Sequence, residues 1–284
     1  MGRVFCLHNS HQTDSTNVRE RLARLSERAT HFDIELVVVD ENSYDFSSKC
    51  PCGTDDAVYN VARGAVILEQ LFLRSNPKSV YRELPSSGTI SNNKLSDTAI
   101  DIRGIQTPKT IWYCTNDRRM LRTYVDSLGG FPLVLKAGRG TRGIGVFLAP
   151  NWAALLGLVD YFYSIKTRIC LREYIPTKSC ERHIVLGDSV VASFARPIAE
   201  NDFRSDGTPT VCLSLDADSE AEELLIRATH ASNYLFGGVN IVTNENTGNK
   251  YVLEINCPVD IGSVDQICDS DVAGSLVQWL ADAK

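Results

Sequence analysis

The stretch Pro132-Leu-Val-Leu-Lys-Ala-Gly-Arg-Gly-Thr-Arg-Gly-Ile-Gly-Val-Phe-Leu148 carries the strongest structural signal in the chain. Two apolar segments flank a turn rich in glycine, which predicts two strands joined by a glycine-rich loop. Such a loop lets backbone N–H groups approach an anion closely, and Lys136 would bring its ammonium group to the same place. The pattern favours a polyphosphate held under a β-hairpin. The alternative is a flexible hairpin with an incidental lysine. It is not a P-loop, because the lysine precedes the glycines.

Two later segments, 238–242 and 253–256, alternate between apolar and polar residues. Alternate residues of a strand share a face, so Glu254 and Asn256 project together while Leu253 and Ile255 face the core. If the hairpin is symmetric about Thr247, Asn240 lies opposite Glu254. Three oxygen-bearing side chains on one face of a ribbon are typical of a Mg²⁺ site that also contacts phosphates. A polar face exposed to solvent is the alternative.

Three arginines, Arg182, Arg196 and Arg204, lie in the same C-terminal region. Guanidinium groups neutralise phosphoryl oxygens and carboxylates, which makes these residues candidates for an anion site. A solvated surface role is the default for any single arginine.

The first ninety residues alternate between strand and helix patterns. Apolar runs at 4–7 and 34–39 predict strands, and the stripe at 18–29 predicts a helix. The spacing of Val58, Val61, Ala65, Leu68 and Leu71 predicts a second amphipathic helix. This alternation indicates a small parallel sheet with crossover helices. His8, Asn9 and His11 follow the first strand, where open α/β sheets commonly bind ligands, although a turn-forming polar stretch is the simpler explanation.

The rest of the chain has a different character. Thr115, Asn116 or Asp117 can cap a helix that ends at Gly129-Gly130, and Asn151 can cap a second helix through residue 163. Residues 169–174 predict a strand. Hairpins are expected around Gly187-Asp188 and between 239–242 and 251–255, followed by a closing helix over about 269–283.

Composition excludes several classes. The chain has 284 residues, 29 Lys+Arg against 35 Asp+Glu, and a net charge of −6. An acidic chain is a poor general nucleic-acid ligand, and no apolar run is long enough for a transmembrane helix. The nine cysteines are scattered, so we expect reduced thiols in a cytoplasmic protein. Only Cys50 and Cys52 form a close pair.

From about residue 91 onward the chain resembles the ATP-grasp ligases, most closely the RimK-type branch of ribosomal-protein glutamate ligases and amino-acid-carrier ligases. The resemblance covers about two thirds of the chain and rests on several motifs in register rather than on any single one. The matching segments begin at Asn93, Pro132, Gly140, Arg172, Asp202, Gly238, Leu253 and Ser270.

The resemblance implies an α/β (α+β) ATP-grasp fold. It would comprise an N-terminal small parallel-sheet α/β domain (1–90) and two α+β subdomains that clasp the nucleotide. These are a central subdomain with the glycine-rich loop (91–168) and a C-terminal subdomain with the metal site (169–284).

The resemblance also implies roles for individual residues. Lys94 and Lys136 would hold the nucleotide phosphates. Glu173, Tyr174 and Ile175 would contact the adenine, and Glu181 would contact the ribose. The loop over the phosphates would comprise Gly140, Thr141, Arg142, Gly143, Ile144 and Gly145.

Further positions match the reacting centre. Arg182 and Arg196 would neutralise charge near the reacting carbonyl, and Glu254, Asn256 and Asn240 would bind Mg²⁺ or Mn²⁺. Asn256 also begins the segment that shapes the acceptor side, and Arg204 would bind a substrate carboxylate. Asn240 stands where the family usually has an aspartate, and residues 256–260 depart from the usual acceptor segment.

The implied activity is ATP-dependent joining of a carboxylate to an amine through an acyl phosphate, with ADP as product. Amino acids or peptides are the expected substrates, and a homodimer or homotetramer is the expected assembly. Two alternatives remain. One is a nucleotide-binding or regulatory protein that lost turnover, for which Asn240 is the reason. The other is a different chemistry on the same fold, such as phosphotransfer or peptide macrocyclisation.

Overall fold

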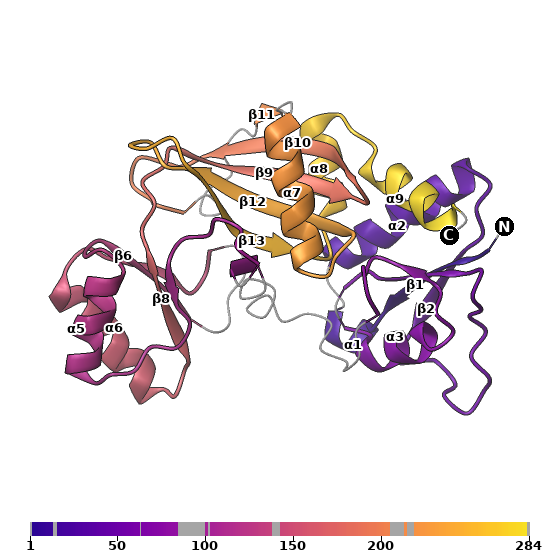
Figure 1. The fold of residues 1–284 in the computed structure, drawn as a ribbon. Helices are drawn as coiled ribbons and strands as arrows, with labels where there is room; N and C mark the ends of the chain where they lie inside the picture. The colour runs from indigo at the N-terminus through magenta and orange to yellow at the C-terminus, as the bar shows by residue number, and fades with distance from the viewer. Residues whose placement is uncertain are drawn as a thin grey trace.

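The structure is a computed structural model that describes residues 2–13, 16–62, 64–84, 100–101, 103–137, 143–204, 213–214 and 219–282. Within these residues the strands form three sheets, one in each of three consecutive parts of the chain (Figure 1). We call these parts the N-terminal, central and C-terminal units. In the part of the chain that is described, every helix is too short or too polar to span a lipid bilayer.

The N-terminal unit contains a parallel sheet with the strand order β2-β1-β3-β4, as the alternation of strand and helix patterns predicted. Its elements are β1 (Val4–His8), α1 (Ser10–Thr13), α2 (Thr16–His31), β2 (Leu36–Asp40), β3 (Ala57–Asn60), α3 (Val66–Leu73) and β4 (Lys78–Ser79). The prediction of a helix starting at Val58 was wrong, because Val58 lies in β3 and α3 begins only at Val66. The apolar residues from Val58 to Leu71 have helical spacing, although they span the end of β3, a turn and part of α3.

The central unit contains an antiparallel sheet with the order β5-β8-β6-β7. Its elements are β5 (Thr110–Ile111), α5 (Arg118–Ser127), β6 (Leu133–Ala137), β7 (Val146–Ala149), α6 (Trp152–Ser164) and β8 (Ile169–Glu173). Asp117 caps α5 by accepting from two backbone N–H groups, and Asn151 caps α6 by accepting from one. Gly129 and Gly130 after α5 both have positive φ, which glycine adopts without strain.

The C-terminal unit is an antiparallel sheet with the order β11-β10-β9-β12-β13. Its elements are β9 (Ser179–Leu186), β10 (Ser189–Pro197), β11 (Leu213–Ser214), α7 (Ser219–Ala231), β12 (Phe236–Thr243), β13 (Lys250–Asn256), α8 (Ile261–Cys268) and α9 (Val272–Ala281). The two predicted hairpins are confirmed. The single closing helix is not, because the chain forms α8 and α9 with a left-handed Asp269 between them.

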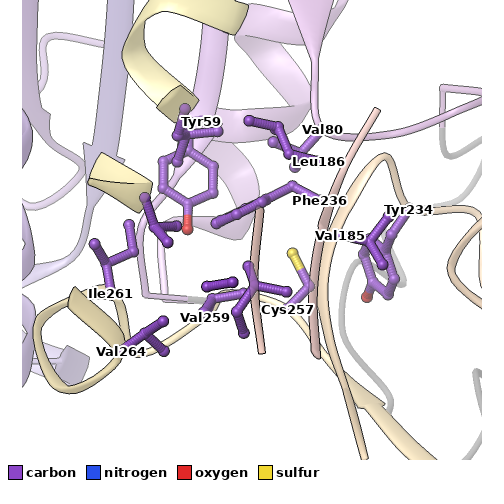
Figure 2. Packing of buried hydrophobic residues seen from close by; sticks show 14 of the residues in the cluster. Tyr59, Val80, Val185, Leu186, Tyr234, Phe236, Cys257, Val259, Ile261 and Val264 are labelled. Atoms are coloured by element: carbon purple, nitrogen blue, oxygen red, sulfur yellow. The ribbon is translucent and has the colours of Figure 1, made fainter. Parts of the chain in front are cut away.

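The N-terminal and C-terminal units share one hydrophobic core. Residues of β1, β3 and α2 pack in the same cluster as residues of β9, β12 and α9. Figure 2 shows Tyr59 of β3 beside Phe236 of β12, and their rings meet edge to face with centroids 6.0 Å apart. The central unit instead packs its own cluster around Leu133, Leu155 and Leu171. The border between the central and C-terminal sheets is therefore a border between two separately packed bodies.

The expected division between residues 168 and 169 falls just before β8. This strand pairs with β5 and β6 and so belongs to the central sheet. We therefore propose that the division follows residue 173.

Candidate active site

A cluster of one carboxylate and two amides lies on the β12–β13 hairpin. Asn240 pairs with Glu254 in register, as predicted. The Nδ2 groups of Asn240 and Asn256 both donate to Glu254 Oε1, at 3.0 and 2.9 Å. The second carboxylate oxygen, Oε2, lies 3.9 Å from Lys136 Nζ at the end of β6. The cluster therefore bridges the border between the central and C-terminal sheets.

The hairpin reaches this pairing through a β-bulge and not through symmetry about Thr247. The register shifts between Asn240, which is opposite Glu254, and Ile241, which is opposite Val252. Leu253 is the extra residue. The expectation that it faces the main core was wrong, because it is only half-buried, against a small cluster that includes Ile175.

Positive charge surrounds the carboxylate. Arg182 on β9 pairs with Asn240, and its guanidinium lies flat against Gly238, where a Cβ atom would come within 2.9 Å of Nε. Burial raises the pKa of Glu254, but the charges of Lys136, Arg182 and Arg172 and the amide of Asn256 outweigh it and bring the pKa below its usual value. Glu254 is thus ionised at neutral pH.

The donor set fits a hard cation. Asn240 is 4% exposed, and its Oδ1 is buried without a hydrogen-bond partner while its Nδ2 is used by Glu254. A buried oxygen of this kind normally has a partner, and together with Glu254 it supplies the oxygen ligands that Mg²⁺ prefers. Among the described residues no group of three His, Cys, Asp or Glu side chains forms a metal cluster, so such a site depends on amide oxygens.

Arg196 lies on the same face of the sheet as Arg182. Arg182 pairs with Phe194, and Arg196 follows two residues later on β10, with its guanidinium 5.6 Å from the Phe194 ring centroid. Residues two apart on a strand share a face, so the structure brings both predicted arginines to the face of Asn240.

Glu181 is not brought to this face. It neighbours Arg182 on β9 and so points to the other side of the sheet, where it contacts His183 Nε2 at 3.2 Å. His183 Nδ1 lies 2.8 Å from Ser193 Oγ. This Ser–His–Glu chain differs from a hydrolytic triad because Ser193 and His183 are both buried. The predicted ribose contact is therefore not supported by this geometry.

The glycine-rich loop lies only partly within the described residues. Lys94, Gly140, Thr141 and Arg142 lie outside them. The end of the loop is described: Gly143 and Gly145 both have positive φ, and Gly145 accepts a backbone bond from Ala137. Ile144 between them is 70% exposed. The loop therefore begins after Ala137, the last residue of β6, and Ile144 near its end is open to solvent.

The segment expected to bind adenine follows β8. The Glu173 carboxylate accepts from the backbone N–H of Lys109 at 2.6 Å, and the backbone N–H of Glu173 donates to the Lys109 carbonyl. Tyr174 is half-buried and Ile175 is buried. Glu173 thus ties the end of β8 to the residue that precedes β5 in the central sheet.

Arg204 is already engaged by a carboxylate. Its Nε and Nη2 donate to the two oxygens of Asp202 at 2.9 and 3.0 Å, and Nη1 contacts the Gly143 carbonyl at 3.4 Å. The hydrogen bonds from Arg204 lower the pKa of Asp202 to about 2. A substrate carboxylate that bound to Arg204 would share its guanidinium with Asp202.

Sequence reasoning missed Arg172, which is 4% exposed on β8 and adds to the charge around Glu254. An arginine inside a strand that is otherwise apolar was the available signal.

A family model, the RimK-like ATP-grasp domain, matches residues 91–280, which is more than half of the chain. The chain belongs to the RimK-like ATP-grasp family. The ribosomal protein bS6–L-glutamate ligase of Escherichia coli is 33% identical over 159 residues, which are 55% of this chain and 52% of that protein. A probable alpha-L-glutamate ligase of Citrobacter koseri matches to the same extent. The match thus spans about half the length of these curated relatives.

Solved structures share the fold over nearly the whole chain. The ATP-grasp ligase PsnB complexed with a minimal precursor has a TM-score of 0.75 at 16% identity and covers 98% of both chains. The macrocyclase MdnC of Microcystis aeruginosa, bound with precursor peptide MdnA, has a TM-score of 0.70 at 13% identity and covers 99% of this chain and 100% of that chain. The predicted ATP-grasp fold is confirmed.

Proposed function

We propose that this RimK-like ATP-grasp protein is an ATP-dependent carboxylate–amine ligase. A substrate carboxylate attacks the γ-phosphorus of ATP, which gives an acyl phosphate and ADP. An amine then attacks the acyl carbon, the amide bond forms, and phosphate leaves. This chemistry needs charge neutralisation and positioning more than a protein nucleophile.

One observation carries the proposal. The Glu254 carboxylate lies beside the positive charges of Lys136 and Arg182 at the border of two sheets. This excess of positive charge suits a polyphosphate, because each added phosphate oxygen would meet a cation already in place.

Mg²⁺ would be held by Glu254, Asn240 and Asn256. When bound, it would neutralise phosphate charge. The amides orient Glu254 through their Nδ2 groups, and the buried Oδ1 of Asn240 is available as a ligand. Mn²⁺ has the same preference for oxygen ligands and is proposed as a substitute.

The remaining roles are proposals of the same kind. Lys94 and Lys136 would contact the phosphates under the loop at 140–145, and residues 173–175 would contact the adenine. Arg182 and Arg196 share the face of Asn240, which supports a place beside the reacting carbonyl. Arg204, held by Asp202, and Asn256 would contact the substrate.

We further propose amino acids or peptides as substrates, a homo-oligomeric assembly and a cytoplasmic location. The substrate class is supported by the relatives, which include an L-glutamate ligase of a ribosomal protein and an enzyme bound to a precursor peptide. Nucleic acid is not expected as a partner, in line with the net charge of −6.

The test is an ADP-release screen of the purified chain with ATP, Mg²⁺ and paired amino acids or short peptides. Lys136→Ala should lower the rate at least 100-fold. Arg119→Ala removes a cation that is 93% exposed and serves as the matched control, with the wild-type rate. If the Lys136→Ala variant turned over like the control, the phosphate assignment would be wrong. Product mass separates ligation, which adds a residue, from ring closure, which removes one water.

A nucleotide-binding protein without turnover is the second candidate. It is favoured by the amides of Asn240 and Asn256, which already occupy Glu254 Oε1. Calorimetry that shows ATP binding, with no ADP formed across the whole screen, would support it.

A further inference from the structure

Arg172 crosses from the central sheet to the C-terminal sheet. It lies on β8, and its Nη1 donates to the Leu253 carbonyl on β13 at 3.0 Å. Its Nε donates to Thr110 Oγ1 on β5 at 2.9 Å, and its guanidinium lies 5.8 Å from the ring centroid of Trp112. The Arg172 side chain, which donates both hydrogen bonds, is 4% exposed.

The carbonyl that Arg172 contacts belongs to the bulge residue. Ile241 is opposite Val252 and Asn240 is opposite Glu254, so Leu253 has no cross-strand partner in the ladder. A bulge leaves its extra residue outside the regular pairing, so its backbone carbonyl needs a donor from outside the ladder. Arg172 supplies that donor.

The bulge decides where Glu254 points. Without it, the pairing that starts at Ile241 and Val252 would place Leu253 opposite Asn240. Glu254 would then project from the other face of the sheet, because a shift of one residue exchanges the two faces. The bulge instead puts Glu254 beside Asn240, Asn256 and Lys136.

We propose that Arg172 is a positioning residue that holds the Leu253 bulge and thereby keeps the Glu254 carboxylate in the metal–phosphate site. This inference rests on the proposed function, since it concerns the same site. Thr110 orients the guanidinium through Nε, which leaves Nη1 directed at the carbonyl. A lysine could supply the charge but not two donors in this fixed arrangement.

The test measures ADP binding to the full chain by calorimetry, with and without Mg²⁺. Arg172→Gln should weaken binding about 10-fold when Mg²⁺ is present, because residues that orient a metal ligand typically affect affinity on this scale. Binding without Mg²⁺ should change less than about twofold. Arg172→Lys should recover only part of the loss. Thr110→Val keeps the shape of the side chain and should weaken Mg²⁺-dependent binding by about threefold.

Arg168→Gln makes the same change at an exposed arginine just before β8 and is the matched control. If Arg172→Gln loses its fold, ADP binding weakens with and without Mg²⁺ alike, and Thr110→Val then decides. The inference is overturned if Thr110→Val shows no selective loss of Mg²⁺-dependent binding. If wild-type protein binds Mg²⁺ and ADP, and Arg172→Gln and Thr110→Val bind like Arg168→Gln, the inference is wrong while the proposed function stands. If wild-type protein binds no ADP in either condition, the proposed function is wrong and the inference falls with it.

Discussion

Two glutamates in this molecule, Glu254 in the C-terminal unit and Glu69 in the N-terminal unit, have opposite electrostatic surroundings. Glu254 lies among cations, and its pKa is lower than usual despite burial. Glu69 on α3 is 1% exposed and accepts hydrogen bonds from Asn60 and from the Tyr81 hydroxyl. Burial raises the pKa of Glu69 to about 7, and these two neutral donors offset only part of the rise.

The difference shows what each region is built to do. At Glu69 two neutral donors do not offset the effect of burial on the pKa, whereas at Glu254 the nearby cations do. A cluster that keeps one carboxylate charged and still has surplus positive charge suits a charged ligand. The Glu69 cluster links α3 to Tyr81, which pairs with Tyr234 of the C-terminal unit. Its role is therefore structural.

The largest effect expected from this comparison is on turnover. Glu254→Gln should lower ADP release at least 100-fold, because it removes the only carboxylate of the proposed metal site. Glu69→Gln makes the same change at the other buried glutamate and should stay within about threefold of wild type. Steady-state ADP release measures both. Equal losses in the two variants would break the distinction between a chemical and a structural carboxylate.

The second effect is on stability and depends on pH. An acid whose pKa is higher in the folded than in the unfolded chain makes the folded state bind more protons. The raised pKa therefore has no effect on the free energy of unfolding below about pH 4.5. Above that pH it lowers the free energy of unfolding increasingly up to about pH 7, and the loss is constant at higher pH. Between pH 5 and pH 8, wild type should lose about 2 kcal/mol of unfolding free energy relative to Glu69→Gln.

Urea unfolding of both proteins at several pH values measures this difference. Two curves that run parallel from pH 5 to pH 8 would show that Glu69 is ionised in the folded state, contrary to the burial argument.

The third effect concerns the metal. Asn240→Asp adds a negative charge beside Glu254 and should lower the Mg²⁺ concentration needed for half-maximal ADP release roughly 5- to 10-fold. The comparable change at an exposed amide, Asn246→Asp in the β12–β13 turn, should have no effect. If Asn240→Asp needed a higher Mg²⁺ concentration than wild type for half-maximal ADP release, repulsion between the two adjacent carboxylates would outweigh their attraction for the cation.

The sequence allowed prediction of those parts of the site that depend on local alternation. Asn240, Glu254 and Asn256 share a face because residues two apart on a strand do so, and the helix caps Asp117 and Asn151 were visible from residue type and place. The same alternation could have shown that Glu181 points away from Arg182.

Other features depend on contacts between distant segments. The bulge at Leu253 lies in a stretch with regular alternation, and only its pairing with β12 and its contact with Arg172, 81 residues earlier in the chain, define it. The separate helices α8 and α9 arise where the Asp265 carboxylate accepts from the Val272 backbone N–H across the Asp269 turn. Periodicity cannot reveal either feature, because both are set by tertiary contacts.

The smallest expected effect is on stability and concerns the Asp202–Arg204 ion pair, which lies outside the Glu254 cluster. Arg204 holds the pKa of Asp202 at about 2. The stabilisation from ionised Asp202 is therefore fully present above about pH 4 and is lost as the pH falls through about 2. Arg204 is partly exposed and solvent screens the pair, so Asp202→Asn should cost less than about 1 kcal/mol at pH 7. Unfolding measured at pH 7 and pH 2, with Asp126→Asn on the surface of α5 as control, tests this. The cost should fall to a small fraction of its pH 7 value at pH 2, because wild-type Asp202 is then about half protonated. A cost that persists at pH 2 would assign the stabilisation to the backbone bonds that Asp202 accepts from Phe203 and Arg204 and not to its charge.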